Sequence, residues 1–370
     1  MNVHRCLLIT TGGTIGGKIN EDRLHGNVHK LKDFTAIVQP AINDVKEDHG
    51  IEVQITDWWV DKEENEHIDV DSSDVNPKHW EQLSSIIYDQ YDEFDSFVIA
   101  HGTNTLGYTS AALTFALTNI NKPVILTGSQ VPAGSAGSDA EMNLNNAIRV
   151  ATFPNSYKGG PLNGVYVVFG SHIISGCRVK KDTEFDYDAF KSFNTGSIGR
   201  IGRIIIIDAH NLSSYKDKLT GRDGLATNKR RLILQNKFDM DIASVTEFPG
   251  MSSDIFKTLA LNGTKGFVLR AFGAGDVSSV HHEVLEFLKE KKIPVIVTTQ
   301  APNGLSNFEV NEPGNFLKVH KLAVPAYDMF IESLTVKLAW LLAQNLTYNE
   351  VCHKMLDNFH GEVNVIHENL

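Results

Sequence analysis

The chain has 370 residues, 42% of them hydrophobic and 21% charged, which is the composition of an ordinary globular protein. This length predicts two domains, because single hydrophobic cores stop growing at about 250–300 residues. The formal net charge of −11 argues against nucleic acid as a partner, because phosphate binding needs a basic face.

The sequence carries no sign of export or of membrane insertion. Only five or six apolar residues precede the first glycines, too few for a signal-peptide core or a membrane span. Cys6, Cys177 and Cys352 are odd in number and far apart, so they predict neither a disulfide framework nor a zinc site. We therefore expect buried free thiols, no membrane partner and a cytoplasmic protein.

Residues 7–10 predict a buried strand that runs into two glycine pairs in the sequence TGGTIGG. Glycines let the backbone approach a ligand closely, and open α/β sheets bind ligands where their strands end. Thr14, between the glycine pairs, is therefore a candidate nucleophile. The alternative is a phosphate-binding turn, although the spacing is not G-x-G-x-x-G. The mostly polar residues 20–31 predict an exposed loop that suits a lid.

Strand and helix patterns alternate along the rest of the chain. They predict helices at 34–45, 77–91, 106–117 and 138–150 and strands at 51–60, 96–100, 123–126, 164–170 and 204–207, followed by strands at 266–271 and 294–299 and helices up to 291 and at 331–345. This alternation is typical of an α/β fold with helices on both faces of a parallel sheet. We expect a larger N-terminal domain at 1–191 that carries the site, a linker at 192–225 and a smaller C-terminal domain at 226–370.

Several motifs, in order along nearly the whole chain, resemble those of the bacterial-type L-asparaginase family. They are TGGTIGG, HGTNT, LTGSQVP and the lysine seven residues before Asp188, while DSSDVNPKHW and GFVLRAFGAG resemble the cytoplasmic type I branch. The resemblance implies a larger N-terminal and a smaller C-terminal α/β domain, assembled as a homodimer or homotetramer. It also implies hydrolysis of the side-chain amide of a small amino acid, asparagine or sometimes glutamine, without a metal or an organic cofactor.

The resemblance also assigns roles to residues. Thr14 matches the family's nucleophile, Thr103 its second threonine and Lys181 the lysine that pairs with that threonine as a base. The substrate-binding positions are Gly13, Gly102, Ser72, Ser73 and Asn104, with Ser72 at the substrate α-carboxylate.

Each of these assignments has a plainer alternative. Thr103 also fits a helix N-cap, Ser72 fits a turn or cap residue ahead of Pro77, and Lys181 fits a solvated charge. Lys180 leaves the choice of lysine ambiguous by one position, and the spacing to Asp188 favours Lys181.

Two positions depart from the family pattern. The second turn carries Asn104 where the family has an aspartate that meets the substrate ammonium group, so a charge-assisted bond becomes a neutral one. The family also has a tyrosine in the loop about a dozen residues beyond its first threonine. Residues 19–31 contain no tyrosine, and His25 and His29 are the groups there that titrate near neutral pH. His25 is the candidate substitute base.

Three functions remain open on these grounds. The preferred one is an asparaginase-type amidohydrolase with a threonine nucleophile. The second is an amidase for a blocked or peptide-linked asparagine, which lacks a free α-ammonium group. The third is a homologue that binds an amino acid without turnover.

Overall fold

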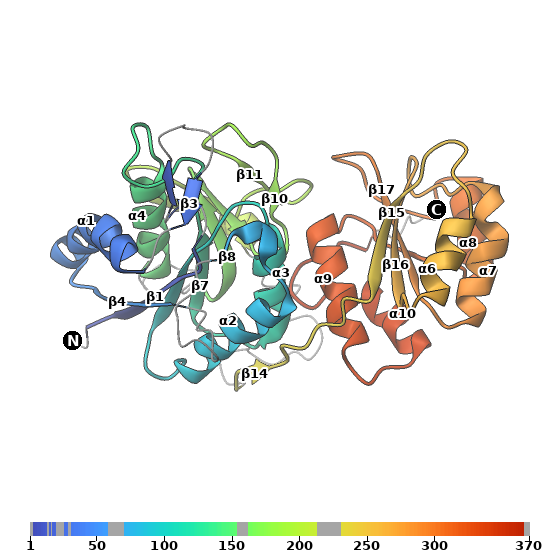
Figure 1. Ribbon diagram of the computed structural model, residues 1–370, viewed down its shortest axis with the longest axis horizontal. Coiled ribbons are helices and arrows are strands. Elements are labelled where there is room, and N and C mark those ends of the chain that lie inside the picture. Colours follow the sequence, from blue (N-terminus) through green and yellow to red (C-terminus); the bar gives the residue numbers. More distant parts are fainter. Residues whose placement is uncertain are drawn as a thin grey trace. The chain divides into compact units, whose positions relative to one another are not determined.

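The computed structural model describes residues 3–12, 15, 17–19, 26–28, 31–57, 70–153, 162–212 and 231–365. The chain forms two compact units, Met1–Asn236 and Lys237–Leu370, whose elements are labelled in Figure 1. In each unit helices pack against a sheet, which confirms the predicted α/β fold class.

The main sheet of the first unit has eight strands within the described residues. In spatial order they are β13 (Ile205–Ile207), β12 (Gly199–Ile201), β9 (His172–Ser175), β8 (Gly164–Phe169), β7 (Pro123–Thr127), β5 (Ser96–Ala100), β1 (Arg5–Thr10) and β4 (Glu52–Asp57). Neighbouring strands from β8 to β4 are parallel, as predicted. At the other edge β9, β12 and β13 pair antiparallel, which makes the whole sheet mixed.

Helices cover both faces of this sheet. They are α1 (Leu31–His49), α2 (Pro77–Asp89), α3 (Leu106–Ala116) and α4 (Ala140–Ala151). Figure 1 shows α1 and α4 on one face and α2 and α3 on the other. Along β1, Leu8 joins the core beneath α1 and α4, whereas Leu7 and Ile9 join the core beneath α2 and α3. A strand buried on both faces reads as a continuous apolar run, which is why it is recognisable in the sequence.

Shorter strands complete the unit in three pairs within the described residues. These pairs are β2 (Gly17–Ile19) with β3 (Gly26–Val28), β6 (Leu117–Thr118) with β14 (Ile233–Leu234), and β10 (Lys180–Lys181) with β11 (Phe190–Lys191). The predicted loop at 20–31 is therefore wrong at 26–28, because β3 pairs with β2. Residues 20–25 and 29–30 of that loop lie outside the described residues.

The expected linker at 192–225 does not coincide with the division of the chain, which falls between Asn236 and Lys237. Residues 199–207 contribute β12 and β13 to the main sheet, and β14 pairs with β6, so both segments belong to the first unit. Short edge strands among glycines and polar residues have a weak sequence pattern, which led to the linker interpretation.

The second unit has a four-stranded parallel sheet within the described residues. Its strands are β15 (Ile242–Thr246), β16 (Gly266–Ala271), β17 (Val295–Thr299) and β18 (Val324–Pro325), and its helices are α6 (Asp254–Leu261), α7 (His282–Glu290), α8 (Glu312–His320), α9 (Ile331–Leu342) and α10 (Tyr348–Leu356). Figure 1 shows α6, α7 and α8 on one side of this sheet and α9 on the other. Gly266 of β16 lies so close to α9 that a Cβ atom there would be 3.1 Å from Leu338.

Two of the remaining predictions concern the thiols and the membrane. Cys6 and Cys177 are buried and Cys352 is half-buried, and all three are free thiols. In the described parts of the chain, no helix combines the length and the apolar character needed to cross a membrane.

Candidate active site

The turn after β5, from His101 to Thr105, is held by a chain of hydrogen bonds. His101 Nδ1 lies 2.6 Å from the Gly102 carbonyl oxygen, and its Nε2 lies 3.0 Å from Thr109 Oγ1, which also accepts from Trp80 Nε1. Burial lowers the pKa of His101 to about 4, so the ring is neutral at pH 7. A neutral ring that donates from Nδ1 and accepts at Nε2 satisfies every partner in this chain.

This turn is bonded to the short 3₁₀ helix η2 (Ser72–Asp74). Asn104 N donates to Ser72 Oγ at 3.2 Å, and Asn104 Nδ2 donates to Ser73 Oγ at 2.9 Å. Thr105 Oγ1 donates to the Ser72 carbonyl at 2.6 Å. The structure therefore brings Ser72, Ser73 and Asn104 together from segments about thirty residues apart in the sequence.

Lys181, on β10, reaches the same turn. Its Nζ lies 3.0 Å from Thr103 Oγ1 and 3.4 Å from Asn104 Oδ1. These contacts belong to Lys181 and not to the neighbouring Lys180. The alternative of a solvated charge therefore does not describe Lys181, which is half-buried against two neutral oxygen atoms.

The electrostatics of Lys181 suit a proton acceptor. Burial lowers the pKa of its amine, and the negative charge of Glu184 partly opposes this. Over the described ranges of the chain, no carboxylate lies within ion-pair distance of Lys181 Nζ. A lysine that is desolvated and bonded only to neutral oxygens loses its proton more readily than one in water.

The cap interpretations of Thr103 and Ser72 do not hold. The N-cap of α3 is Thr105, and that of α2 is Asn76, whose side chain forms a capping box with His79. Thr103 is instead buried with its hydroxyl toward Lys181. Ser72 is the first residue of η2, so it precedes Asn76, the N-cap of α2, and does not cap that helix.

Neighbouring strand ends converge on this turn. Thr10 of β1 pairs with Ala100 of β5, which pairs with Thr127 of β7, so the three strands end in register. The glycine-rich turn after β1 therefore starts beside the turn that holds Thr103. Gly13, Thr14 and His25, the remaining candidate residues, lie outside the described residues.

The end of β7 contributes two residues that the sequence analysis did not single out. A Cβ atom on Gly128 would lie 2.4 Å from the His101 carbonyl oxygen, so only glycine allows these two turns to approach. The hydroxyl of Ser129 is buried without a hydrogen-bond partner among the described residues. The signals in the sequence were their position directly after a predicted strand and their place in the motif LTGSQVP.

Fold and site together define a two-unit α/β protein with a threonine–lysine pair at the carboxyl ends of the parallel strands of a mixed sheet. Residues 5–212 match the family model described as "Asparaginase, N-terminal", and residues 241–355 match "Glutaminase/Asparaginase C-terminal domain". The chain belongs to the asparaginase family.

Proteins with two different names are among its relatives. L-asparaginase 1 of Escherichia coli K12 is 32% identical over 296 residues, which cover 80% of this chain and 82% of that protein. A glutamyl-tRNA(Gln) amidotransferase component of Methanococcus maripaludis C6 is 28% identical over 367 residues, 96% of this chain and 80% of that protein. The thermostable L-asparaginase of Thermococcus kodakarensis has a similar structure, with a TM-score of 0.80 and 28% identity over 98% of this chain and 100% of that chain.

Proposed function

We propose that this protein is an amidohydrolase that hydrolyses the side-chain amide of L-asparagine to L-aspartate and ammonia. The observation that carries the proposal is the contact of 3.0 Å between Lys181 Nζ and Thr103 Oγ1, in a site where no described carboxylate neutralises the amine. A hydroxyl beside an amine of lowered pKa is the arrangement that general-base chemistry requires.

In the proposed reaction the hydroxyl oxygen of Thr14 attacks the side-chain amide carbon, and its proton passes to the Thr103–Lys181 pair. The carbon–nitrogen bond breaks, and the leaving nitrogen takes a proton and departs as ammonia. Water then attacks the acyl-threonine ester, which releases aspartate and restores the Thr14 hydroxyl. Backbone N–H groups of the two glycine turns, at Gly13 and Gly102, are the proposed donors to the oxyanion.

Ser72, Ser73 and Asn104 are the proposed substrate contacts. Hydroxyl and amide groups can donate to the substrate α-carboxylate. We propose no role for a cofactor. A cytoplasmic location is likewise a proposal, supported by the three free thiols.

A second candidate substrate is an asparagine whose α-amino group is blocked or peptide-linked. The observation that favours it is Asn104, which bonds to Ser73 and Lys181 with a neutral amide and offers no charge to an α-ammonium group. Relative to a carboxylate, the neutral partner forms a bond of about half the strength.

Ammonia release from L-asparagine, L-glutamine and N-acetyl-L-asparagine tests both candidates. We expect turnover of L-asparagine that disappears in Thr14→Ala and in Thr103→Val. Preference for the acetylated compound would favour the second candidate. Unchanged turnover in both variants would contradict the proposed chemistry, and binding of asparagine without ammonia release by the unmodified protein would show an impaired homologue.

A further inference from the structure

Three buried side chains connect α2 and α3 to the turn that carries Thr103. Trp80 of α2 donates from Nε1 to Thr109 Oγ1 of α3 at 3.1 Å, and this oxygen lies 3.0 Å from His101 Nε2. None of the three residues is more than 4% exposed, so a hydrogen bond lost among them would leave a buried polar atom unsatisfied. We call Trp80, Thr109 and His101 the His101 relay.

The direction of every hydrogen bond in the His101 relay follows from the indole group. Trp80 Nε1 can only donate, so Thr109 Oγ1 accepts from it and has one hydrogen left to donate to His101 Nε2. The neutral ring therefore carries its hydrogen on Nδ1 and donates it to the Gly102 carbonyl oxygen at 2.6 Å. The opposite tautomer would set two acceptors, Nδ1 and the carbonyl oxygen, against each other at this distance. The relay thus fixes one tautomer of His101.

The hydrogen bond from His101 also fixes the direction of the peptide group between Gly102 and Thr103. In a trans peptide the carbonyl and the N–H point in opposite directions. The Gly102 carbonyl is bonded to the buried ring, so the Thr103 N–H points away from that ring. Thr103 is buried, yet its N–H donates to no acceptor among the described residues. A buried N–H needs a partner, and a bound ligand can supply one.

We propose that the His101 relay is a positioning device, which holds the Thr103 N–H toward the substrate as a donor to the oxyanion that forms on the amide carbonyl. This inference rests on the proposed function, because it assumes that an amide is attacked beside Thr103. The donor adds to the N–H groups proposed at Gly13 and Gly102. A donor that is already oriented stabilises the transition state without having to turn during the reaction.

Thr109→Val tests the His101 relay, since valine has nearly the shape of threonine but no hydroxyl group. The tautomer of His101 is then no longer fixed, so the Thr103 N–H loses its direction and kcat for L-asparagine should fall at least about tenfold. KM should change less, because the oxyanion exists only in the transition state. Thr109→Ser keeps the hydroxyl and should retain most of kcat. Unchanged kcat in Thr109→Val, or an equal fall in Thr109→Ser, would overturn the proposal.

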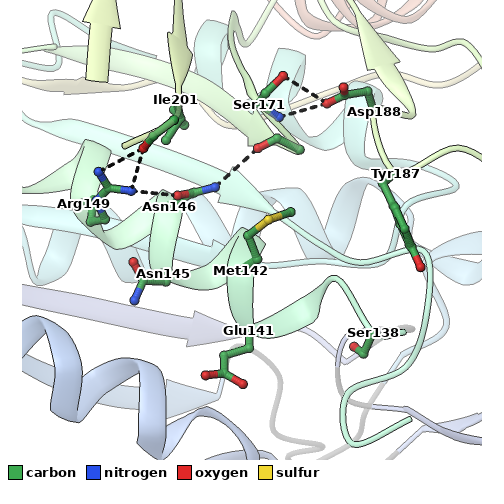
Figure 2. A pocket seen from close by; sticks show the side chains of 12 residues that line it. Ser138, Glu141, Met142, Asn145, Asn146, Arg149, Ser171, Tyr187, Asp188 and Ile201 are labelled. Atoms are coloured by element: carbon green, nitrogen blue, oxygen red, sulfur yellow. Dashed lines mark hydrogen bonds between the residues drawn. The ribbon is translucent and has the colours of Figure 1, made fainter. Parts of the chain in front are cut away.

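Asn146→Ala is the matched control for a loss of stability. Figure 2 shows the hydrogen bonds of Asn146, a buried residue of α4 whose Nδ2 donates to the Gly170 carbonyl oxygen at 3.4 Å. This variant also removes a buried bond to a glycine carbonyl after a strand of the main sheet, but no candidate site residue adjoins Gly170 in the sequence. Denaturant titration should show a less stable protein, whereas kcat should stay unchanged. An equal fall in kcat would show that the relay has no special role.

Nitrogen-15 NMR of the histidine rings tests the His101 relay without catalysis. The unmodified protein and Thr109→Ser should show His101 with its hydrogen on Nδ1. In Thr109→Val the form with hydrogen on Nε2 should appear and the Thr103 amide signal should move, whereas Asn146→Ala should leave both unchanged. Hydrogen on Nε2 in the unmodified protein would overturn the inference. Absence of ammonia release from a protein that passes this NMR test would instead contradict the proposed function.

Discussion

Lys181 is positioned so that its charge state depends on few neighbours. Its amine contacts the hydroxyl of Thr103 and the amide oxygen of Asn104, and the charge of Glu184 acts on it without an ion pair. Because Asn104 is neutral, this contact supplies no negative charge that would hold the amine protonated as strongly as a carboxylate would. The residue that departs from the family pattern therefore bears on the base as well as on substrate binding.

The pH dependence of turnover tests this effect. The proposed base is active when neutral, so kcat/KM should fall as the pH drops through the pKa of Lys181, which burial has lowered. Asn104→Asp adds a negative charge that favours the protonated amine. It should therefore shift the acidic limb of the kcat/KM profile to a higher pH, by about one pH unit. Asn104→Gln, which stays neutral, is the control and should leave the limb in place. An unshifted limb in Asn104→Asp would remove Lys181 as the titrating base.

At the scale of elements, the site depends on how closely the turns after β5 and β7 approach each other. The turns after β5 and β7 touch at Gly128 and the His101 carbonyl oxygen. Any side chain at Gly128 would force the β5 turn, which carries Thr103, to shift. Strand register and a missing Cβ atom thus position the catalytic candidates.

Gly128→Ala should therefore impair turnover more than folding. The added methyl group would force backbone shifts that destabilise the protein by about 1–3 kcal/mol, while kcat should fall at least tenfold. Chemical denaturation and ammonia release measure the two effects. Gly202→Ala is the matched control, since a Cβ atom there would meet nothing within 4 Å. Full activity in Gly128→Ala would contradict this account of the turn.

A buried ion pair fastens the C-terminal segment to α9. Lys337 Nζ lies 2.7 Å from Glu362 Oε1 and also donates to the Met355 carbonyl, and both charged side chains are fully buried. Burial opposes ionisation of Glu362, but Lys337, His360 and backbone N–H groups outweigh it and lower its pKa to about 2. The ionised pair is therefore the folded form at neutral pH.

Removing one charge of this pair should be costly. Glu362→Gln removes the carboxylate charge that faces the buried Lys337 ammonium, so we expect a loss of about 3–5 kcal/mol in the free energy of unfolding. Since the folded pKa lies below the unfolded value, the stabilisation is complete above about pH 4.5 and fades as the pH falls toward 2. Glu362→Gln should lack this pH dependence in denaturant titrations. Lys265→Met, which breaks an exposed ion pair with Asp239, is the control and should change stability little.

For the whole molecule, assembly as the homodimer or homotetramer that the family resemblance implies would link stability to protein concentration. Association of folded chains stabilises them by mass action, so Tm should rise by a few degrees over about a hundredfold increase in concentration. Scanning calorimetry at two concentrations measures this, and a Tm that does not change with concentration would contradict self-association.

Much of the architecture was visible in the sequence because buried parallel strands are continuous apolar runs. Strands such as β1, β5 and β7 have no polar face. Each is followed within a few residues by glycine and hydroxyl residues, which indicate where the strand ends. The edge strands β12 and β13 do not have this apolar pattern. They are three residues each and partly exposed, so the segment looked like a linker until strand pairing placed it in the sheet.

The sequence by itself determined the fold class, the family motifs and the choice of Ser72, Thr103, Asn104 and Lys181 as candidates. Only the tertiary structure decided that these four side chains meet, since their contacts join segments 31 to 78 residues apart. It also decided which threonine caps α3 and why residue 128 must be glycine. Local patterns report which face of an element is buried, whereas contacts between distant residues and exposure to solvent follow from packing.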